Sequence, residues 1–205
     1  MTFTDRQPLT RERVATAAVA FIDEHGLDAL SMRKLGAELG VEAMSLYNHV
    51  ANKADLLDAV SDRLYTDVLA AYGEPTGDWK LHARALSHAY VDVAAAHPKA
   101  VTLLIHPARE SDAAEIFDQR IVEAAQLMTD DPRIGALAFA TVASWVIGTI
   151  VNEHGVVPVA APLLDDGCED PRQLQRAADL LSAEEKFNEG LEVVLAGLEA
   201  RYFAD

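Results

Sequence analysis

The most informative stretch of the chain is LSMRKLGAELGVEAMSLYNHV, residues 30–50. Ser31 is a typical helix N-cap, and the apolar residues of the short helix that it starts are Met32, Leu35 and Leu39. Gly40 ends this helix, because glycine adopts the positive φ of a tight turn at little cost. A further short helix is expected from about Glu42 to His49. The stretch therefore predicts two short helices joined by one tight turn.

Packing of the two short helices leaves one face of each free. The residues expected to pack inward are Leu35, Leu39, Leu46 and Val50, together with Phe21 and Ile22. The free faces carry Arg33, Lys34, Ala43, Met44, Ser45, Tyr47, Asn48 and His49. A pair of helices of this kind places the second helix in the DNA major groove while the first crosses the phosphate backbone. The stretch therefore predicts a helix-turn-helix surface for double-stranded DNA.

The residue types on these faces suit base edges and phosphates. Arginine pairs bidentately with guanine, asparagine pairs with adenine, serine bonds to several bases, and small apolar side chains contact the thymine methyl group. Tyrosine, histidine and lysine are well placed for phosphates. Lys53 opens the next helix, where free backbone N–H groups and the helix dipole already favour an anion. We therefore expect phosphate contacts to position the protein and base contacts to select the sequence.

Residues 27–60 strongly resemble the DNA-binding region of the TetR family of repressors. The matching segments are Leu39-Gly40-Val41, Ser45-Leu46-Tyr47, His49-Val50 and the run KADLLDA at 53–59. The resemblance is greatest to the tetracycline-repressor branch, which shares the pattern Leu-Tyr-x-His-Val-x-x-Lys. It implies base reading by Arg33, Ala43, Met44, Ser45 and Asn48, and phosphate contacts by Tyr47, His49 and Lys53. Ala43, Met44 and Asn48 differ from that branch, which argues against its operator sequence.

The rest of the chain is also predicted to be helical, so the expected fold class is all-α. Apolar residues recur three or four positions apart, and no stretch alternates long enough for a strand. Further helices are expected at about 10–26, 52–72, 78–97, 111–128, 134–152 and 182–202. Thr10 is the expected N-cap of the first of these, Asn52 with the capping acid Asp55 starts the second, and Ser182 with Glu185 forms a capping box before the last. We predict a three-helix DNA-binding domain at residues 5–55 and a helical ligand-binding and dimerisation domain at residues 56–205.

Residues 134–152 contain no charged side chain. A helix of this length could almost cross a bilayer. Polar residues and glycines interrupt the segment, however, and no basic flank accompanies it. We therefore expect a central helix buried on all sides, and no membrane partner.

The C-terminal part resembles the ligand domain of tetracycline repressors more loosely. The matching features are Asp78-Trp79, His97-Pro98, Gly148 and the Phe187-x-x-Gly190-Leu191 ending. The resemblance implies that the apolar helix and the last helix pair with those of a second subunit. Apolar periodicity in the last helix agrees, with Leu191, Val194 and Leu198 as expected dimer contacts. A two-fold homodimer presents recognition helices about 34 Å apart and so predicts a palindromic operator.

A small-molecule effector is expected in the C-terminal domain, with a pocket assigned to His106, Phe117, Phe139, Trp145 and Asn152. Aromatic residues on such helices also occur as ordinary core, and that alternative stays open. No cofactor or metal is expected, because neither a His-Glu-x-x-His motif nor a cysteine pair occurs. His106 and Glu153 only weakly resemble the positions where tetracycline repressors hold a magnesium-drug complex.

Charge and composition limit the remaining classes. The net charge of −16 lies almost wholly outside residues 1–55, which contain six Lys and Arg against eight Asp and Glu. An acidic body would orient the protein on DNA, or simply keep it soluble. The single cysteine, Cys168, permits no intramolecular disulfide, and the N-terminus lacks a secretory pattern, so a cytoplasmic location is expected.

Two other functions compete with that of a regulator. An enzyme is not expected, because no nucleophile-base or metal constellation is identifiable, and Cys168 lies among acidic residues that lower its reactivity. A helical small-molecule-binding or carrier module without DNA readout is the stronger alternative. Arg33, Lys34 and Lys53 favour DNA binding over such a module.

Overall fold

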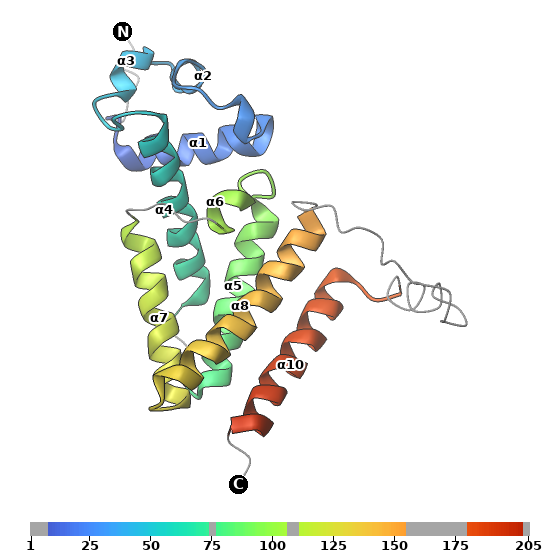
Figure 1. Ribbon diagram of the computed structural model, residues 1–205. Helices are drawn as coiled ribbons and strands as arrows, with labels where there is room; N and C mark the ends of the chain where they lie inside the picture. Colours follow the sequence, from blue (N-terminus) through green and yellow to red (C-terminus); the bar gives the residue numbers. More distant parts are fainter. Residues whose placement is uncertain (1–7, 74–76, 106–110, 155–179, 203–205) are drawn as a thin grey trace. The chain divides into compact units, whose positions relative to one another are not determined.

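The computed structural model describes residues 8–73, 77–105, 111–154 and 180–202 (Figure 1). These residues form helices and connecting turns without a strand, which confirms the all-α prediction. The chain divides into two compact units. Unit 1 consists of Met1–Gly73 and Asp92–Arg120, and unit 2 consists of Glu74–Val91 and Ile121–Asp205. The predicted division into functional domains at residue 55 stays a prediction.

Unit 1 is built from a series of short and medium helices. They are α1 (Arg11–His25), the 3-10 helix η1 (Leu27–Ala29), α2 (Met32–Glu38), α3 (Ala43–Leu46), α4 (Lys53–Tyr72) and α6 (Val101–Ile105). The C-terminal end of α5 (Trp79–Ala96) and the first part of α7 (Asp112–Met128) also belong to it. Its core is apolar, and the fully buried side chains include Val14, Ile22, Leu35, Leu46, Leu56 and Leu64.

The predicted caps start these helices. The side-chain oxygens of Thr10, Ser31 and Asn52 accept hydrogen bonds from the backbone N–H three residues on, at 3.2, 3.3 and 3.1 Å. Gly26 follows α1 with φ of 84°, and Gly40 forms the turn after α2 with φ of 65°. Local sequence therefore sets where α1, α2 and α4 begin and where the first two end.

α3 is shorter than the predicted helix over residues 42–49. It spans Ala43–Leu46, and residues 47–49 form a turn. The backbone N–H groups of His49 and Val50 both donate to the Leu46 carbonyl, at 2.9 and 3.0 Å. Regular helical hydrogen bonding ends after Val50 because the chain then turns into α4. The side chain of Val50 is buried at this turn.

Polar contacts join α4 to later parts of unit 1. The Tyr65 hydroxyl donates to the Leu104 carbonyl, and the Ser61 hydroxyl donates to the Leu103 carbonyl, both at 2.9 Å. Asp62 Oδ1 accepts from the Ser111 hydroxyl at 2.9 Å and from the Ala113 N–H at 3.0 Å. α4 is therefore tied by hydrogen bonds both to α6 and to the first turn of α7.

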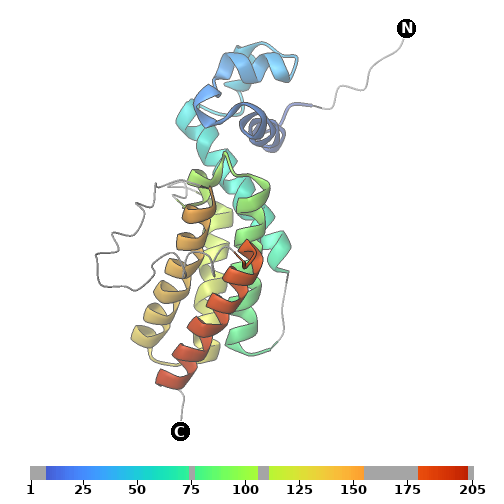
Figure 2. The ribbon, with the colours of Figure 1, turned by 90° about the vertical axis from the view of Figure 1, so that its right-hand side faces the viewer.

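Unit 2 contains most of α5 and α7, together with α8 (Pro132–His154) and α10 (Ala183–Tyr202). α8 and α10 lie side by side (Figures 1 and 2). The predicted capping box starts α10, with mutual hydrogen bonds between Ser182 and Glu185 at 2.7 and 3.1 Å. Gly190 allows the close approach of the two helices, since a Cβ there would overlap the Trp145 indole.

The prediction that the apolar helix is buried on all sides is wrong for the single chain. α8 is long and apolar enough to cross a membrane, but only 22% of its most apolar 18-residue window is buried. Leu137 and Phe139 are 50% and 43% exposed. α10 packs against α8, and α8 nevertheless keeps the exposed apolar side chains Leu137 and Phe139. One such helix is weak evidence for a membrane span, because the core helix of a soluble protein can have the same length and composition.

Candidate nucleic-acid interface

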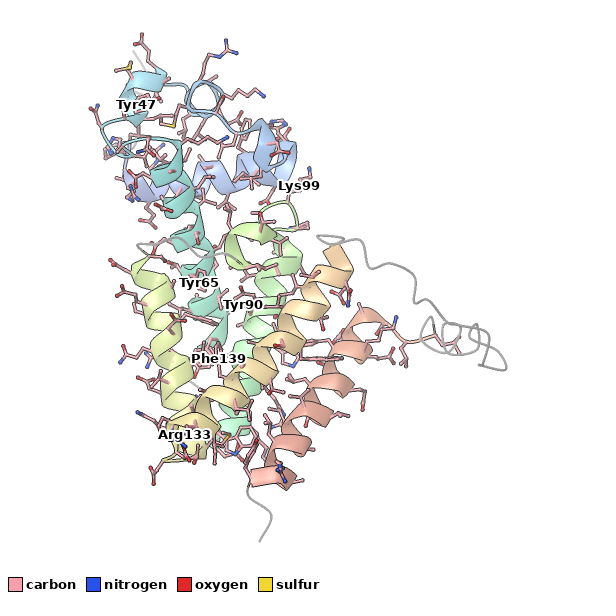
Figure 3. All side chains as sticks on the ribbon, in the orientation of Figure 1. Tyr47, Tyr65, Tyr90, Lys99, Arg133 and Phe139 are labelled. Carbon is pink, nitrogen blue, oxygen red and sulfur yellow. The ribbon has the colours of Figure 1, made fainter. Side chains whose placement is uncertain are left out.

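The predicted DNA-reading residues lie at the surface of unit 1. Met44 and Tyr47 are 71% and 44% exposed. Figure 3 labels Tyr47 beside α3. Arg33, Lys34, Asn48 and Lys53 are also exposed, whereas Ala43, Ser45 and His49 are partly exposed. Leu46 is fully buried and so anchors α3 to the core from its inner side. All nine residues thus keep surface accessible to a ligand.

Gly36 sets the distance between α2 and α3. A Cβ at this position would lie 3.0 Å from the Val41 carbonyl oxygen and 3.2 Å from both Cα and N of Ala43. These are backbone atoms, which cannot move aside as a flexible side chain can. The Val41 N–H also donates to the Gly36 carbonyl at 2.9 Å. This requirement was not predicted, because the sequence does not show which backbone atoms lie against a glycine within a helix.

Arg11 holds the segment that follows α3. Its guanidinium donates to the His49 carbonyl at 3.2 Å, to the Asp55 carbonyl at 3.3 Å and to Asp55 Oδ1 at 2.5 Å. Asp55 Oδ2 accepts from the Ala51 N–H at 2.6 Å. We call Arg11 and Asp55 the clamp. The sequence predicted Asp55 only as a capping acid, and its reach to α1 was not foreseen.

The clamp perturbs both of its ionisable groups. The hydrogen bond from Arg11, followed by that from the Ala51 N–H, lowers the pKa of the Asp55 carboxyl below its ordinary value. The bond to Asp55 raises the pKa of the Arg11 guanidinium. Asp55 therefore stays ionised at neutral pH, and the clamp persists as an ion pair.

The basic side chains of the surface are Arg33, Lys34 and Lys53. Among the described residues, no carboxylate forms an ion pair with any of them. Lys53 is the first residue of α4, where the helix dipole adds positive potential. Three positive charges are thus available to an anionic ligand near α3.

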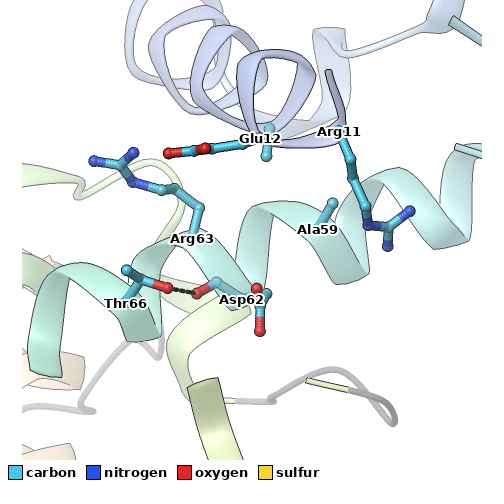
Figure 4. A pocket seen from close by; sticks show the side chains of 7 residues that line it. Arg11, Glu12, Ala59, Asp62, Arg63 and Thr66 are labelled. Atoms are coloured by element: carbon cyan, nitrogen blue, oxygen red, sulfur yellow. Dashed lines mark hydrogen bonds between the residues drawn. The ribbon is translucent and has the colours of Figure 1, made fainter. Parts of the chain in front are cut away.

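A polar cleft of about 360 Å³ lies between α1 and α4 in unit 1 (Figure 4). It is lined by Arg11, Glu12, Ala15, Ala59, Asp62, Arg63 and Thr66. Arg63 forms two hydrogen bonds to the Asp67 carboxylate, at 3.0 and 2.8 Å, and reaches Thr16 of α1 at 3.4 Å. The charges in this lining balance, so the cleft differs from the apolar effector pocket that the sequence predicts.

The predicted effector residues occupy varied positions. His106 and Cys168 lie outside the described residues. In unit 1, Phe117 stacks edge-on against Tyr65 with ring centroids 5.4 Å apart. In unit 2, the partly buried Trp145 indole donates to the Phe187 carbonyl at 3.4 Å and lies against Gly190. Phe139 and Asn152 are exposed. The pocket assignment stays a prediction.

The predicted dimer contacts lie on the inner side of α10. Leu191 and Leu198 are 1% and 6% exposed, and Val194 is partly buried against Met128, Ala138 and Leu198. These leucines pack inside their own chain because their face of α10 turns toward α8. The large exposed apolar side chains among the described residues of the two helices are Leu137, Phe139 and Val193.

The described residues contain no candidate metal-binding site. No group of three or more His, Cys, Asp or Glu side chains there could hold a metal ion.

Comparison with known proteins gives consistent results. Residues 15–60 match the family model of bacterial regulatory proteins of the tetR family. The tetracycline repressor protein class D of Escherichia coli is 30% identical over 207 residues, covering 96% of this chain and 92% of that protein. The HTH-type transcriptional repressor DrrR1 of Streptomyces coeruleorubidus is 38% identical over 90 residues, covering 44% of this chain but only 33% of that repressor.

A solved structure extends the similarity to the whole fold. The TetR family protein ActR of Streptomyces coelicolor, in complex with (S)-DNPA, superposes with a TM-score of 0.74 and 25% identity. The match covers 95% of this chain and 98% of ActR. The helices described above therefore follow an arrangement already known from experiment.

Proposed function

The chain belongs to the tetR family of bacterial regulatory proteins, and on that premise we propose that it is a cytoplasmic transcriptional repressor. It binds a palindromic operator as a homodimer and leaves the DNA when a small molecule binds. One observation carries the proposal: α3 and the turn that follows it expose Met44, Tyr47 and Asn48, with Arg33 and Lys34 exposed on α2.

The surface divides into readers and anchors. Arg33 and the residues Ala43, Met44, Ser45 and Asn48 contact base edges, since these side chains carry the hydrogen-bonding or apolar groups that the major groove distinguishes. Lys34, Tyr47, His49 and Lys53 contact phosphates, which fix the orientation but carry no sequence information. In this proposal residues 5–55 form the reading domain.

A homodimer would bury exposed apolar side chains of unit 2. Leu137 and Phe139 on α8 and Val193 on α10 are 50%, 43% and 71% exposed, and exposed large apolar side chains favour burial against a partner. A two-fold axis there presents two identical reading surfaces, so each half of the operator repeats the other in inverted orientation.

A small molecule bound within residues 56–205 releases the DNA. The names of two relatives support such an effector: one is a tetracycline repressor, and ActR was solved in complex with (S)-DNPA. Release requires that the effector bind better to a conformation whose reading surfaces no longer match the operator spacing. Reciprocity then requires that operator DNA weaken effector binding by the same factor.

The test is a titration of fluorescent duplex DNA with the full-length protein at several salt concentrations. The duplexes come from the region beside the protein's own gene, with scrambled duplexes as controls. Lys53→Ala should weaken binding to all duplexes alike and lower the salt slope by about 1, whereas Ser45→Ala should change the preference among them. Equal losses on all duplexes for both variants would contradict the assigned roles. If no duplex binds in a salt-dependent way, the carrier module is the better account.

A further inference from the structure

The clamp connects three parts of unit 1 through one guanidinium. Arg11 is the first residue of α1, His49 ends the turn after α3, and Asp55 lies in the first turn of α4. Both carboxylate oxygens of Asp55 are used, one by Arg11 and the other by the Ala51 N–H. The backbone from 49 to 55 is therefore fixed at both ends and near its middle.

This fixed segment links the base readers of α3 and its following turn to two of the phosphate anchors. The proposed readers Ala43, Met44, Ser45 and Asn48 precede it, and the proposed anchors His49 and Lys53 lie within it. α3 itself has only four helical residues, so its own hydrogen bonds cannot hold the following turn rigid. Contacts to base edges tolerate displacements of only about 0.5 Å. Something outside α3 must supply this rigidity.

We propose that Arg11 and Asp55 are positioning residues that set the alignment of the base-reading residues relative to the phosphate anchors. The inference rests on the proposed function and goes beyond it by assigning sequence discrimination to a pair that touches no base. Without the clamp the protein still attracts DNA, because Lys34 and Lys53 remain, but it loses the ability to distinguish one sequence from another.

The clamp is suited to this role rather than to holding the fold together. The Arg11 and Asp55 side chains are 47% and 29% exposed, and exposed ion pairs contribute little to folding stability. The buried side chains of Leu46, Val50 and Leu56 anchor the same segment to the core. Losing the clamp should therefore leave the protein folded.

Arg63 supplies a matched control. It is also an arginine of unit 1, pairs with Asp67 on α4 and reaches Thr16 of α1. Replacing it removes the same charge from the same pair of helices, yet no hydrogen bond joins it to residues 47–55 in the described structure.

The experiment first selects duplexes from a randomised pool with the wild-type protein. The affinity for a selected duplex is then compared with that for a scrambled duplex of equal composition. Arg11→Ala should lower the ratio of the two affinities at least about tenfold, Arg11→Lys should restore part of it, and Arg63→Ala should leave it unchanged. The affinity for scrambled DNA should fall equally in Arg11→Ala and Arg63→Ala, because both lose one positive charge.

Three results would overturn the inference. Equal losses of Arg11→Ala on both duplexes would make Arg11 a simple phosphate contact. Unfolding of Arg11→Ala at room temperature would make the clamp a structural element. A wild-type protein that selects no sequence at all would refute the proposed function, and the clamp's role with it.

Discussion

Replacing Gly36 by alanine tests how tightly the two short helices must approach. The added Cβ would meet backbone atoms at 3.0 and 3.2 Å, whereas ordinary contact begins at 3.4 Å. α2 and α3 must therefore separate by about 0.2 to 0.4 Å. Overpacking of this kind costs about 1–3 kcal/mol, and the better helix propensity of alanine offsets about 0.8–1 kcal/mol. We expect a net loss of stability between about 0 and 2 kcal/mol.

Two measurements follow from this prediction. Urea unfolding monitored by circular dichroism gives the stability, and titration of a selected duplex gives the affinity. Ala37→Gly is the matched control, because Ala37 is exposed on the same helix and its replacement costs about 1 kcal/mol without pushing on α3. At comparable stability, Gly36→Ala should bind the selected duplex more weakly than Ala37→Gly does. If Gly36→Ala is more stable than the wild type and binds with unchanged preference, the close approach is not a constraint.

Three further predictions concern the surroundings of the reading surface and unit 2. Leu46→Ala removes a fully buried side chain, so it should destabilise the protein by about 2–5 kcal/mol in urea unfolding, and a loss below about 1 kcal/mol would show that α3 is not anchored there. Because Arg11 lowers the pKa of Asp55 from its ordinary 3.8, the stabilising effect of Asp55 is present above that pH and disappears as the pH falls through the lowered value. Asp55→Asn should therefore be less stable than the wild type at pH 7, by no more than about 1 kcal/mol because the pair is partly exposed. In strong acid the two proteins should be equally stable. A stability difference that persists in strong acid would contradict the role given to the ionised Asp55 carboxylate. Gly190→Ala should displace the Trp145 indole, which would shift the tryptophan fluorescence and lower the stability by about 1–3 kcal/mol, whereas an unchanged spectrum and stability would refute the overlap.

Much of the fold follows from local chemistry and was predictable. Thr10, Ser31, Asn52 and Ser182 each cap the helix that the sequence assigned to them, because an N-cap depends on one side chain and the next few N–H groups. Turn glycines such as Gly40 are equally local. The exposure of the reading surface also followed from the spacing of apolar residues on α2 and α3.

What the sequence could not predict depends on contacts between distant residues. Arg11 and Asp55 are 44 positions apart, and the sequence around each of them does not predict that they form an ion pair. Leu191 and Leu198 have the periodicity of a packing face, but periodicity does not tell whether the partner is the same chain or another. The apolar sequence of α8 is ambiguous in the same way. A run of apolar residues does not tell whether the helix is buried within its own chain or against a second copy of the chain.

Hydrogen-deuterium exchange of the full-length protein, with and without a duplex selected from a random pool, tests the central claim most directly. Backbone amides report where a ligand covers or rigidifies the chain. Bound DNA should slow exchange in peptides that cover residues 31–53, with the strongest effect over 43–49. Protection confined to α8 or α10, with exchange at 43–49 unchanged, would contradict the assignment of this surface to DNA.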